Sequence, residues 1–231
     1  PDMKFHPLPS SLFPLPSSRS HKGFTLIEML VVIGIIAALI AASLGGYSFA
    51  TKRAQKARGR ELVSNVATAL NTLFQRDNRW PPSLLSEANG EGRLTAKAAA
   101  CLAVRGLMSL SYTTTEKDGE KVYTLSGLDR CGIVSPWAAE VLKRLPTGAS
   151  GLDASVPSGG TVQDHQLHFA VDTEGNGFVE VRLGSTAVRV RATVAVWSWG
   201  MNGKEDDYEG SMSGRGKCDD IYSWTRAQEV R

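Results

Sequence analysis

The feature that most constrains this chain is an apolar run that begins at Phe24, FTLIEMLVVIGIIAALIAASLGGY. A run of about 20 predominantly apolar residues is the length that a helix needs to cross the hydrocarbon core of a bilayer. The run contains one charged residue, Glu28. A carboxylate in a spanning segment costs a few kcal/mol and is therefore usually paired or functional, although near the end of the span it could reach the interface. The run predicts a membrane-spanning helix in which Glu28 has a role.

The residues that precede this run, 1–23, are rich in Pro and Ser. Such a stretch cannot propagate a helix and has too little regular apolar content to pack, so we expect a leader that is removed. In an ordinary secretory signal the cleavage site follows the apolar run, whereas here the plausible processing point comes before it. A simple membrane anchor would explain the apolar run but not Glu28.

The segment HKGFTLIEMLVVIGIIAALIA resembles the prepilin signature of type IV pilins and type II secretion pseudopilins. The residues that match the family pattern are Lys22, Gly23, Phe24, Thr25, Leu26, Ile27 and Glu28. The resemblance implies that a prepilin peptidase on the cytoplasmic side cuts between Gly23 and Phe24 and methylates the new Phe24 amine. It also implies that Glu28 pairs with the Phe24 amine of a neighbouring subunit during assembly.

Independent physical reasoning supports this role for Glu28. Two opposite charges inside a dry helix bundle are stabilised mainly by each other, and a missing partner leaves a buried charge. Glu28 would therefore fix the register between neighbouring helices. The alternative is a membrane anchor that carries an accidental acid near its end.

The basic residues that flank the apolar run disagree with the orientation that this resemblance implies. The leader holds three, and five follow the run: Lys4, Arg19 and Lys22, then Lys52, Arg53, Lys56, Arg58 and Arg60. The positive-inside rule alone would place the head in the cytoplasm. The motif instead implies a single pass through the bacterial inner membrane with the C-terminal head in the periplasm. We interpret the basic run mainly as a solvated face, with attraction to acidic lipid headgroups as the alternative.

Four segments follow from these patterns: a leader (1–23), a transmembrane and assembly helix (24–46), an amphipathic stem helix (47–79) and a globular periplasmic head (80–231). At the first helix boundary, each glycine of Gly45-Gly46 weakens a helix by about 1 kcal/mol relative to Ala, which predicts a local kink or unwinding.

The stem helix is predicted from a helical stripe of apolar residues, with polar residues on the opposite face. The stripe contains Leu62, Val66, Ala69, Leu70 and Leu73, and the polar face contains Arg60, Glu61, Ser64, Asn65 and Asn71. The helix should end near Asp77-Asn78, because Trp80-Pro81-Pro82 forbids its continuation.

The head is predicted to have one modest core, since 231 residues with 42% apolar content hardly support two independent domains. We expect another helix within 83–110, a strand at VYTL and a short helix capped by Ser135. Period-two alternation predicts strands at HQLHFAV, GFVEVRL and VRVRATVAVWSW. The class is α+β: a long N-terminal helix, half transmembrane and half amphipathic, packed on a small antiparallel sheet, as in pilins.

The sequence DTEGNG, between the first two of these strands, is predicted to be a hairpin connection, because Asn-Gly supports positive backbone angles. It also begins like a calcium loop, with Asp172, Glu174 and Asn176 at alternate positions. A calcium loop needs an acid at its twelfth position, which holds Leu183 here. A turn is therefore favoured over a metal site.

A second acidic segment, 198–224, is glycine-rich and too long to be a mere connection. Its oxygen-bearing side chains would repel one another unless a hard cation such as calcium drew them together. The segment resembles the C-terminal calcium loop of major pseudopilins at Ser198, Gly200, Gly203, Asp219, Asp220, Ile221 and Trp224. Asn202 replaces an expected Asp, and the insert is longer. The suspected calcium ligands are Asn202, Asp207, Glu209, Asp219 and Asp220; the alternative is a solvated acidic loop.

No residue pattern typical of an enzyme is evident. His165 and His168 are three apart in a strand-like segment, which places them on opposite faces, and neither a nucleophile elbow nor a phosphate loop occurs. Cys101, Cys131 and Cys218 lack the spacing of a zinc site and permit at most one internal disulfide. Basic and acidic residues are almost equal in number outside the leader, so a nucleic-acid partner is not expected.

The function implied by both resemblances is that of a pseudopilin subunit of a type II secretion system. Such a subunit would be processed by prepilin peptidase and polymerise with itself and other pseudopilins on an inner-membrane secretion platform. One alternative is a type IV pilin of an extracellular fibre. Another is a membrane-anchored periplasmic binding or enzymatic domain, which an apolar pocket with convergent polar groups would favour.

Overall fold

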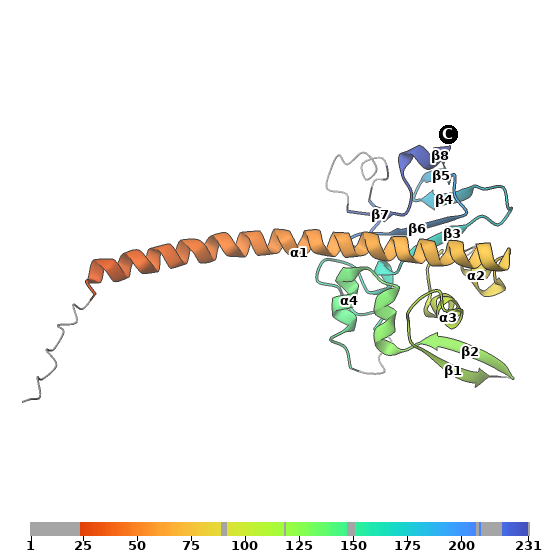
Figure 1. Cartoon of the computed structure of the whole chain (residues 1–231), viewed down its shortest axis with the longest axis horizontal. Helices are drawn as coiled ribbons and strands as arrows, with labels where there is room; N and C mark the ends of the chain where they lie inside the picture. The colour runs from red at the N-terminus through yellow and green to blue at the C-terminus, as the bar shows by residue number, and fades with distance from the viewer. Residues whose placement is uncertain are drawn as a thin grey trace, which may run out of the picture. The chain divides into compact units, whose positions relative to one another are not determined.

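The computed structural model describes residues 24–88, 92–117, 119–146, 151–206, 208 and 219–230. The chain divides into two compact units, Pro1–Ser48 and Phe49–Arg231. One long helix, α1 (Leu26–Asp77), contributes residues to both units (Figure 1).

In the first unit, α1 is apolar and uncovered by protein. The large apolar side chains between Leu26 and Ile40 are 45–83% exposed. Among the described residues, α1 is the one helix long and apolar enough to cross a membrane, and none of its apolar window is buried in protein. The chain is also helical through Gly45-Gly46, so the predicted unwinding is wrong. Adding each residue to an existing helix forms another backbone hydrogen bond, which offsets the glycine penalty.

In the second unit, α1 is amphipathic as predicted. Val66, Ala69, Leu70 and Leu73 are at most 4% exposed, and Leu62 of the predicted stripe is half-buried. Arg60, Glu61, Ser64 and Asn65 of the predicted polar face are exposed, and Asn71 is half-buried.

The end of α1 also agrees with the prediction. The helix ends at Asp77, and Asn78 follows with a φ of 49°, in the left-handed region that Asn tolerates better than most residues. The Asn78 N–H donates to the Phe74 carbonyl at 2.7 Å. The chain then turns away before the two prolines.

Two short helices, α2 (Pro82–Ala88) and α3 (Ala96–Val104), replace the single helix expected within 83–110. Between them, Gly92 has a φ of 64°, which is left-handed backbone that favours glycine. Thr95 then caps α3, since its side chain accepts a hydrogen bond from the Ala98 N–H. The helical composition of this region was recognised, but the break within it was not.

The fourth helix, α4 (Pro136–Leu142), begins where predicted. Its N-cap residue, Ser135, makes no side-chain capping bond; the hydroxyl instead lies 2.8 Å from Nδ1 of His165. The expected side-chain cap is therefore wrong, because a buried partner competes for the hydroxyl. Three short 3-10 helices complete the helical elements of the described residues: η1 (Gly127–Gly132), η2 (Gln163–His165) and η3 (Arg226–Gln228).

The strands of the described residues form three antiparallel groups (Figure 1). The first is the hairpin of β1 (Tyr112–Lys117) and β2 (Glu120–Leu125), which contains VYTL. The second has the order β3-β6-β7, with bounds His168–Val171, Val194–Ser198 and Ile221–Tyr222. The third has the order β4-β5-β8, with bounds Val179–Leu183, Thr186–Val190 and Glu229–Val230.

The predicted hairpin across DTEGNG is wrong, because β3 pairs with β6 and β4 pairs with β5. DTEGNG instead connects two different sheets. The Asp172 carboxylate accepts hydrogen bonds from four backbone N–H groups at 2.7–3.3 Å: Glu174, Gly175, Asn176 and Gly177. This internal network satisfies the carboxylate and agrees with the preference for a turn over a metal site.

The core joins the stem part of α1 to the sheet β3-β6-β7. Val66, Leu70 and Leu73 belong to the same buried cluster as Phe169 of β3 and Val196 of β6. A second cluster lies over β4 and β5 and includes Trp197 and Trp224. The second unit is thus a helix packed on small antiparallel sheets, which confirms the α+β class and the pilin-like arrangement.

Candidate functional site

The N-terminal end of α1 carries two of the predicted assembly residues. Phe24 is 77% exposed. Oε2 of Glu28 accepts hydrogen bonds from both the N–H and the hydroxyl of Thr25, each at 2.8 Å, and the Glu28 N–H donates back to the Thr25 hydroxyl at 3.3 Å. This reciprocal arrangement is a capping box, which holds the carboxylate at the first turn of the helix.

Glu28 has no cationic partner within ion-pair distance among the described residues. Its acceptor capacity is larger than the two bonds from Thr25, because a carboxylate offers about four lone-pair sites. The carboxylate can therefore accept an amine from outside the chain without losing its cap. Lys22 and Gly23 of the predicted cleavage site lie outside the described residues, so their role stays a prediction.

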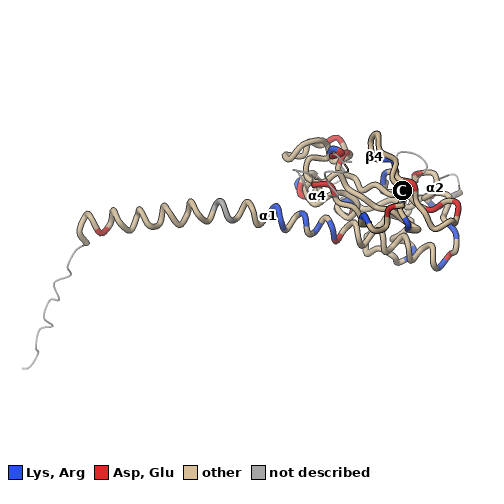
Figure 2. Tube along the Cα trace, turned by 90° about the horizontal axis from the view of Figure 1, so that it is seen from above, with Lys and Arg blue, Asp and Glu red and all other residues tan. Residues whose placement is uncertain are grey.

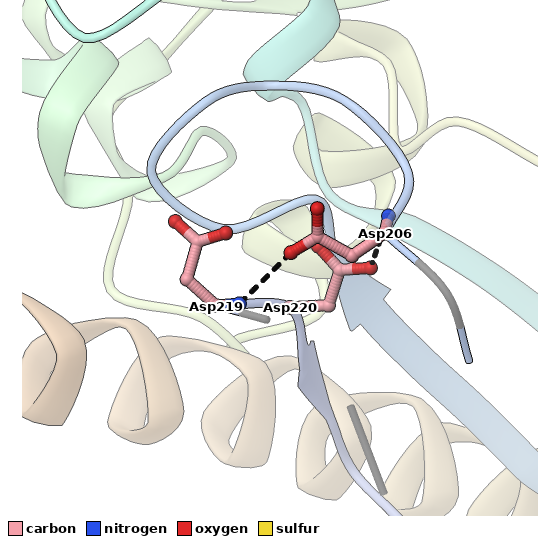
Figure 3. Close-up of side chains that lie close together, drawn as sticks. All are labelled: Asp206, Asp219 and Asp220. Carbon is pink, nitrogen blue, oxygen red and sulfur yellow. Dashed lines mark hydrogen bonds between the residues drawn. The ribbon is translucent and has the colours of Figure 1, made fainter. Parts of the chain in front are cut away.

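A second site lies between β6 and β7, where the antiparallel pairing of Ser198 with Ile221 brings the two ends of the acidic segment together. Asp206, Asp219 and Asp220 each contribute a carboxylate oxygen, and these oxygens lie within 4.8 Å of one another. Figure 3 shows the three carboxylates converging. The Asp219 N–H donates to Oδ2 of Asp206 at 2.9 Å, and the Asp206 N–H donates to Oδ2 of Asp220 at 3.0 Å. These bonds join residue 206 to residues 219 and 220 within the acidic segment.

The cluster is deficient in positive charge and in hydrogen-bond donors. Asp220 is 8% exposed, and Oδ1 of Asp219 and Oδ1 of Asp220 are buried without a hydrogen-bond partner among the described residues. Burial, reinforced by the negative charges of Asp206 and Asp219, raises the pKa of Asp220 to about 7. Burial and the nearby Asp206 also raise the pKa of Asp219. Such crowded, dehydrated carboxylates are costly to ionise without a cation.

These residues fit a hard cation. Calcium binds flexible sets of carboxylate and carbonyl oxygens, and two of the oxygens here lack any other partner among the described residues. Asp206, Asp219 and Asp220 are the residues that would hold it. When bound, the cation would neutralise their mutual repulsion.

The predicted calcium ligands differ in where the structure places them. Asp219 and Asp220 lie in the cluster, and Asp207 and Glu209 lie outside the described residues. Asn202 is placed differently: its side-chain NH2 donates to Oδ1 of Asp206 at 3.3 Å, and its side-chain Oδ1 accepts from the Lys204 N–H at 2.8 Å. The described part of the structure thus gives Asn202 a supporting contact with the cluster.

Asp206 belongs to the cluster but was absent from the predicted ligands. Residue type could not have selected it, since Asp207 is identical and adjacent. The distinguishing feature is the pair of backbone hydrogen bonds that joins residue 206 to residues 219 and 220. Those bonds depend on the pairing of β6 with β7, which period-two alternation does not reveal.

Two glycines of the acidic segment allow close packing beside the cluster. Gly200 has a φ of 62°, and a Cβ there would lie 2.6 Å from backbone atoms of Asp219. Gly203 has a φ of 64°, and a Cβ there would lie 2.7 Å from Nε2 of His165. Both positions therefore require glycine for conformation and for space.

His165 is a buried polar link next to this segment. Its Nε2 lies 2.9 Å from the Gly159 carbonyl oxygen, so Nε2 carries the hydrogen, and the Ser135 hydroxyl donates to Nδ1 at 2.8 Å. The ring is 1% exposed, and burial lowers its pKa. The residue is a neutral core histidine, in line with the incidental role predicted for it.

The head also contains a pocket of about 620 Å³. Apolar side chains such as Ile133, Val134 and Leu152 line it together with Arg93 and Arg130. Glu87 also lines it, and its carboxylate accepts a hydrogen bond from the hydroxyl of Thr95, another lining residue. The pocket thus offers apolar surface together with cations and one carboxylate.

The similarity of this chain to known proteins includes its N-terminal region. A family model described as the prokaryotic N-terminal methylation motif matches residues 18–44. The type IV major pilin protein PilE1 of Neisseria gonorrhoeae is 37% identical over 60 residues, which are 26% of this chain and 36% of that protein. A fimbrial protein of Moraxella nonliquefaciens is 33% identical over 79 residues, which are 34% of this chain and 51% of that protein.

A further relative aligns with this chain over most of the relative's own length. The competence protein ComGC of Bacillus subtilis is 33% identical over 82 residues, which are 36% of this chain and 82% of that protein. By contrast, the chain spans only about a third of the length of the gonococcal pilin that it matches. No solved structure matches the chain.

Proposed function

The chain belongs to the type IV pilin and pseudopilin family, and we propose that it is a pseudopilin subunit of a type II secretion system, cut before Phe24 and assembled into a periplasmic pseudopilus. The observation that carries this proposal is the first unit of α1. Its large apolar side chains are exposed along the helix, and one carboxylate, Glu28, lies near the start.

Such a helix needs an apolar surrounding at every stage. A bilayer supplies it before assembly, and the same helices of other subunits supply it afterwards. On leaving the lipid, Glu28 would enter a dry bundle, where the methylated Phe24 amine of a neighbour is its natural partner. The head would then lie on the periplasmic side, and the chain would act by assembly rather than by turnover.

The acidic cluster supports the assignment of this subunit to a type II secretion system. Its position in the chain and its residues Asp219 and Asp220, with Trp224 after them in the sequence, resemble the C-terminal segment of major pseudopilins. We infer that calcium binds Asp206, Asp219 and Asp220 and orders this segment. Other pseudopilins and an inner-membrane platform would be the partners of such a subunit.

A second candidate is a type IV pilin of an extracellular fibre, which the relatives named as pilins and fimbrial proteins favour. It uses the same processing and the same Glu28 pairing, but it predicts long surface fibres. The pocket lined by Ile133, Val134 and Arg130 favours a third candidate, a membrane-anchored binding domain. That candidate needs neither cleavage nor pairing.

The test is to express the chain with a prepilin peptidase and a secretion platform and to follow two variants. Gly23→Ala should retain the leader, and Glu28→Ala should lose the leader yet fail to form cross-linked ladders of subunits. Glu61→Ala is the matched control, because Glu61 is an exposed acid on the same helix. A plain anchor would tolerate both changes, and normal ladders from Glu28→Ala would rule out the proposed assembly.

A further inference from the structure

The stretch of α1 from Lys52 to Arg60 is densely basic. It contains five cations and no acid: Lys52, Arg53, Lys56, Arg58 and Arg60. The stretch lies wholly within the second unit, and Figure 2 shows blue alternating with tan along this part of the helix. Apart from the longer-range attraction between Lys56 and Asp219, the proposed assembly helix and acidic cluster do not involve these residues.

Four of the cations share one face of the helix. Lys52, Lys56 and Arg60 recur at intervals of four residues, and Arg53 lies beside them. Together with Phe49 and Ala57 they surround an open hollow of about 510 Å³. Like charges at this spacing repel one another, so the arrangement is unfavourable unless an anion is shared between them.

Among the described residues, the cations of this face form no ion pair, although Lys56 attracts the Asp219 carboxylate at longer range. Among the described residues, no carboxylate lies within 4.0 Å of Lys52, Arg53, Lys56 or Arg60. Lys52, Arg53 and Arg60 are exposed, and Lys56 is half-buried. Their donors are therefore available to a partner outside the chain.

The residues that come before this face indicate the kind of partner. The basic stretch follows the exposed apolar run, and two aromatic residues separate them: Tyr47, 71% exposed, and Phe49, 67% exposed. Aromatic side chains concentrate at membrane–water interfaces, and cations next to a spanning helix attract anionic lipid headgroups. The order of apolar, aromatic and basic residues is that of a helix passing from hydrocarbon through the interface to the headgroups.

We propose that Lys52, Arg53, Lys56 and Arg60 form a binding site for the phosphate groups of anionic phospholipids at the surface of the membrane that the apolar part of α1 spans. Guanidinium and ammonium groups both donate to phosphate oxygens, and the shared hollow allows several donors to reach one headgroup. The site explains why these cations lie on the side of the span where the positive-inside rule does not place them. It would hold the membrane pool of subunits against extraction, whichever filament they join.

The test uses the full chain reconstituted in phosphatidylcholine vesicles with a trace of spin-labelled phosphatidylglycerol or spin-labelled phosphatidylcholine. The fraction of motionally restricted label measures association of each lipid with the protein. We expect phosphatidylglycerol to associate at least about threefold more strongly at low salt, and the preference to fall toward unity at about 0.5 M salt. This salt titration needs no variant, so it does not depend on the folding of one.

The variant Lys52→Gln/Arg53→Gln/Lys56→Gln/Arg60→Gln should lose most of the preference. The matched control, Lys97→Gln/Lys121→Gln/Arg182→Gln/Lys204→Gln, removes four exposed cations elsewhere in the second unit and should keep it. Equal association of both lipids with the wild type, or an undiminished preference in the first variant, would overturn the proposal. Cross-linking of copies in neutral vesicles that depends on these four cations, without lipid preference, would assign them to a second copy and also overturn it.

Discussion

At the scale of single residues, Asp219 and Asp220 are the most crowded acids of the described residues in the acidic segment. Each has a buried carboxylate oxygen without a partner among the described residues, although neighbouring backbone N–H groups bind their other oxygens. A buried acceptor left without a donor costs about 1–3 kcal/mol. Bound calcium would remove this free-energy cost at both residues.

Calcium should stabilise the wild type and not Asp220→Asn. A ligand that binds only the folded state at 100 times its Kd adds about 2.7 kcal/mol to the free energy of unfolding, so the chelator EGTA should lower the Tm of the wild type. The chelator should leave the Tm of Asp220→Asn unchanged, because that variant lacks one carboxylate. Asp153→Asn, at an exposed position, serves as the control. An unchanged wild-type Tm would count against the calcium site.

His165 should make stability depend on pH in the opposite sense to a buried acid. Burial lowers its pKa from the usual 6.5, so the folded state favours the neutral ring. The resulting contribution to the free energy of unfolding is fully present above about pH 6.5. It is lost as the pH falls through the lowered pKa of the folded state. In calcium-saturated protein, the drop in Tm between pH 7.5 and 5 should be larger for the wild type than for His165→Gln. Equal drops would show that the ring does not titrate in this way.

At the scale of elements, the stem part of α1 was the most predictable feature. Its 3.6-residue periodicity identified the buried stripe, and Asn78 with the prolines after it identified the helix end. These are local signals, carried by residues close together in the chain. The break between α2 and α3 was missed because Ala-rich sequence on one side of Gly92 masked it.

The packing of this stem gives a direct mutational test. Leu70 is fully buried, so Leu70→Ala should lower the free energy of unfolding by about 2–5 kcal/mol. Ser64→Ala, on the exposed face of the same helix, should change it by less than about 0.5 kcal/mol. Denaturant unfolding of the full chain in detergent, followed by tryptophan fluorescence, measures both. Similar losses for the two variants would contradict the assigned face of the helix.

The strands show where sequence reasoning stopped. Alternation located β3, β4, β5 and β6, but not the pairing of β3 with β6, which bypasses the two strands between them in the chain. The run VRVRATVAVWSW was expected to be one strand, yet residues 191–193 divide it between β5 and β6. The membership of Asp206 in the acidic cluster depends on the same non-local pairing and could not be read from residue type.

At the scale of the whole molecule, two parts of the chain differ in how their apolar side chains are covered. The apolar part of α1 has no protein cover, whereas the second unit has its own buried clusters. The sequence predicted an apolar helix at residues 24–46, because membrane insertion follows from composition over a short span. The assembly roles of Phe24 and Glu28 stay predictions. Features of the head such as the pocket beside Arg130 could be identified only from the three-dimensional structure.

The central claim is that this chain is a processed filament subunit, and the mass of the mature protein tests it most directly. After co-expression with a prepilin peptidase, mass spectrometry should find a chain that begins at N-methylated Phe24 and lacks residues 1–23, and Gly23→Ala should prevent the change. A wild-type chain that keeps residues 1–23 in the presence of an active peptidase would contradict the account.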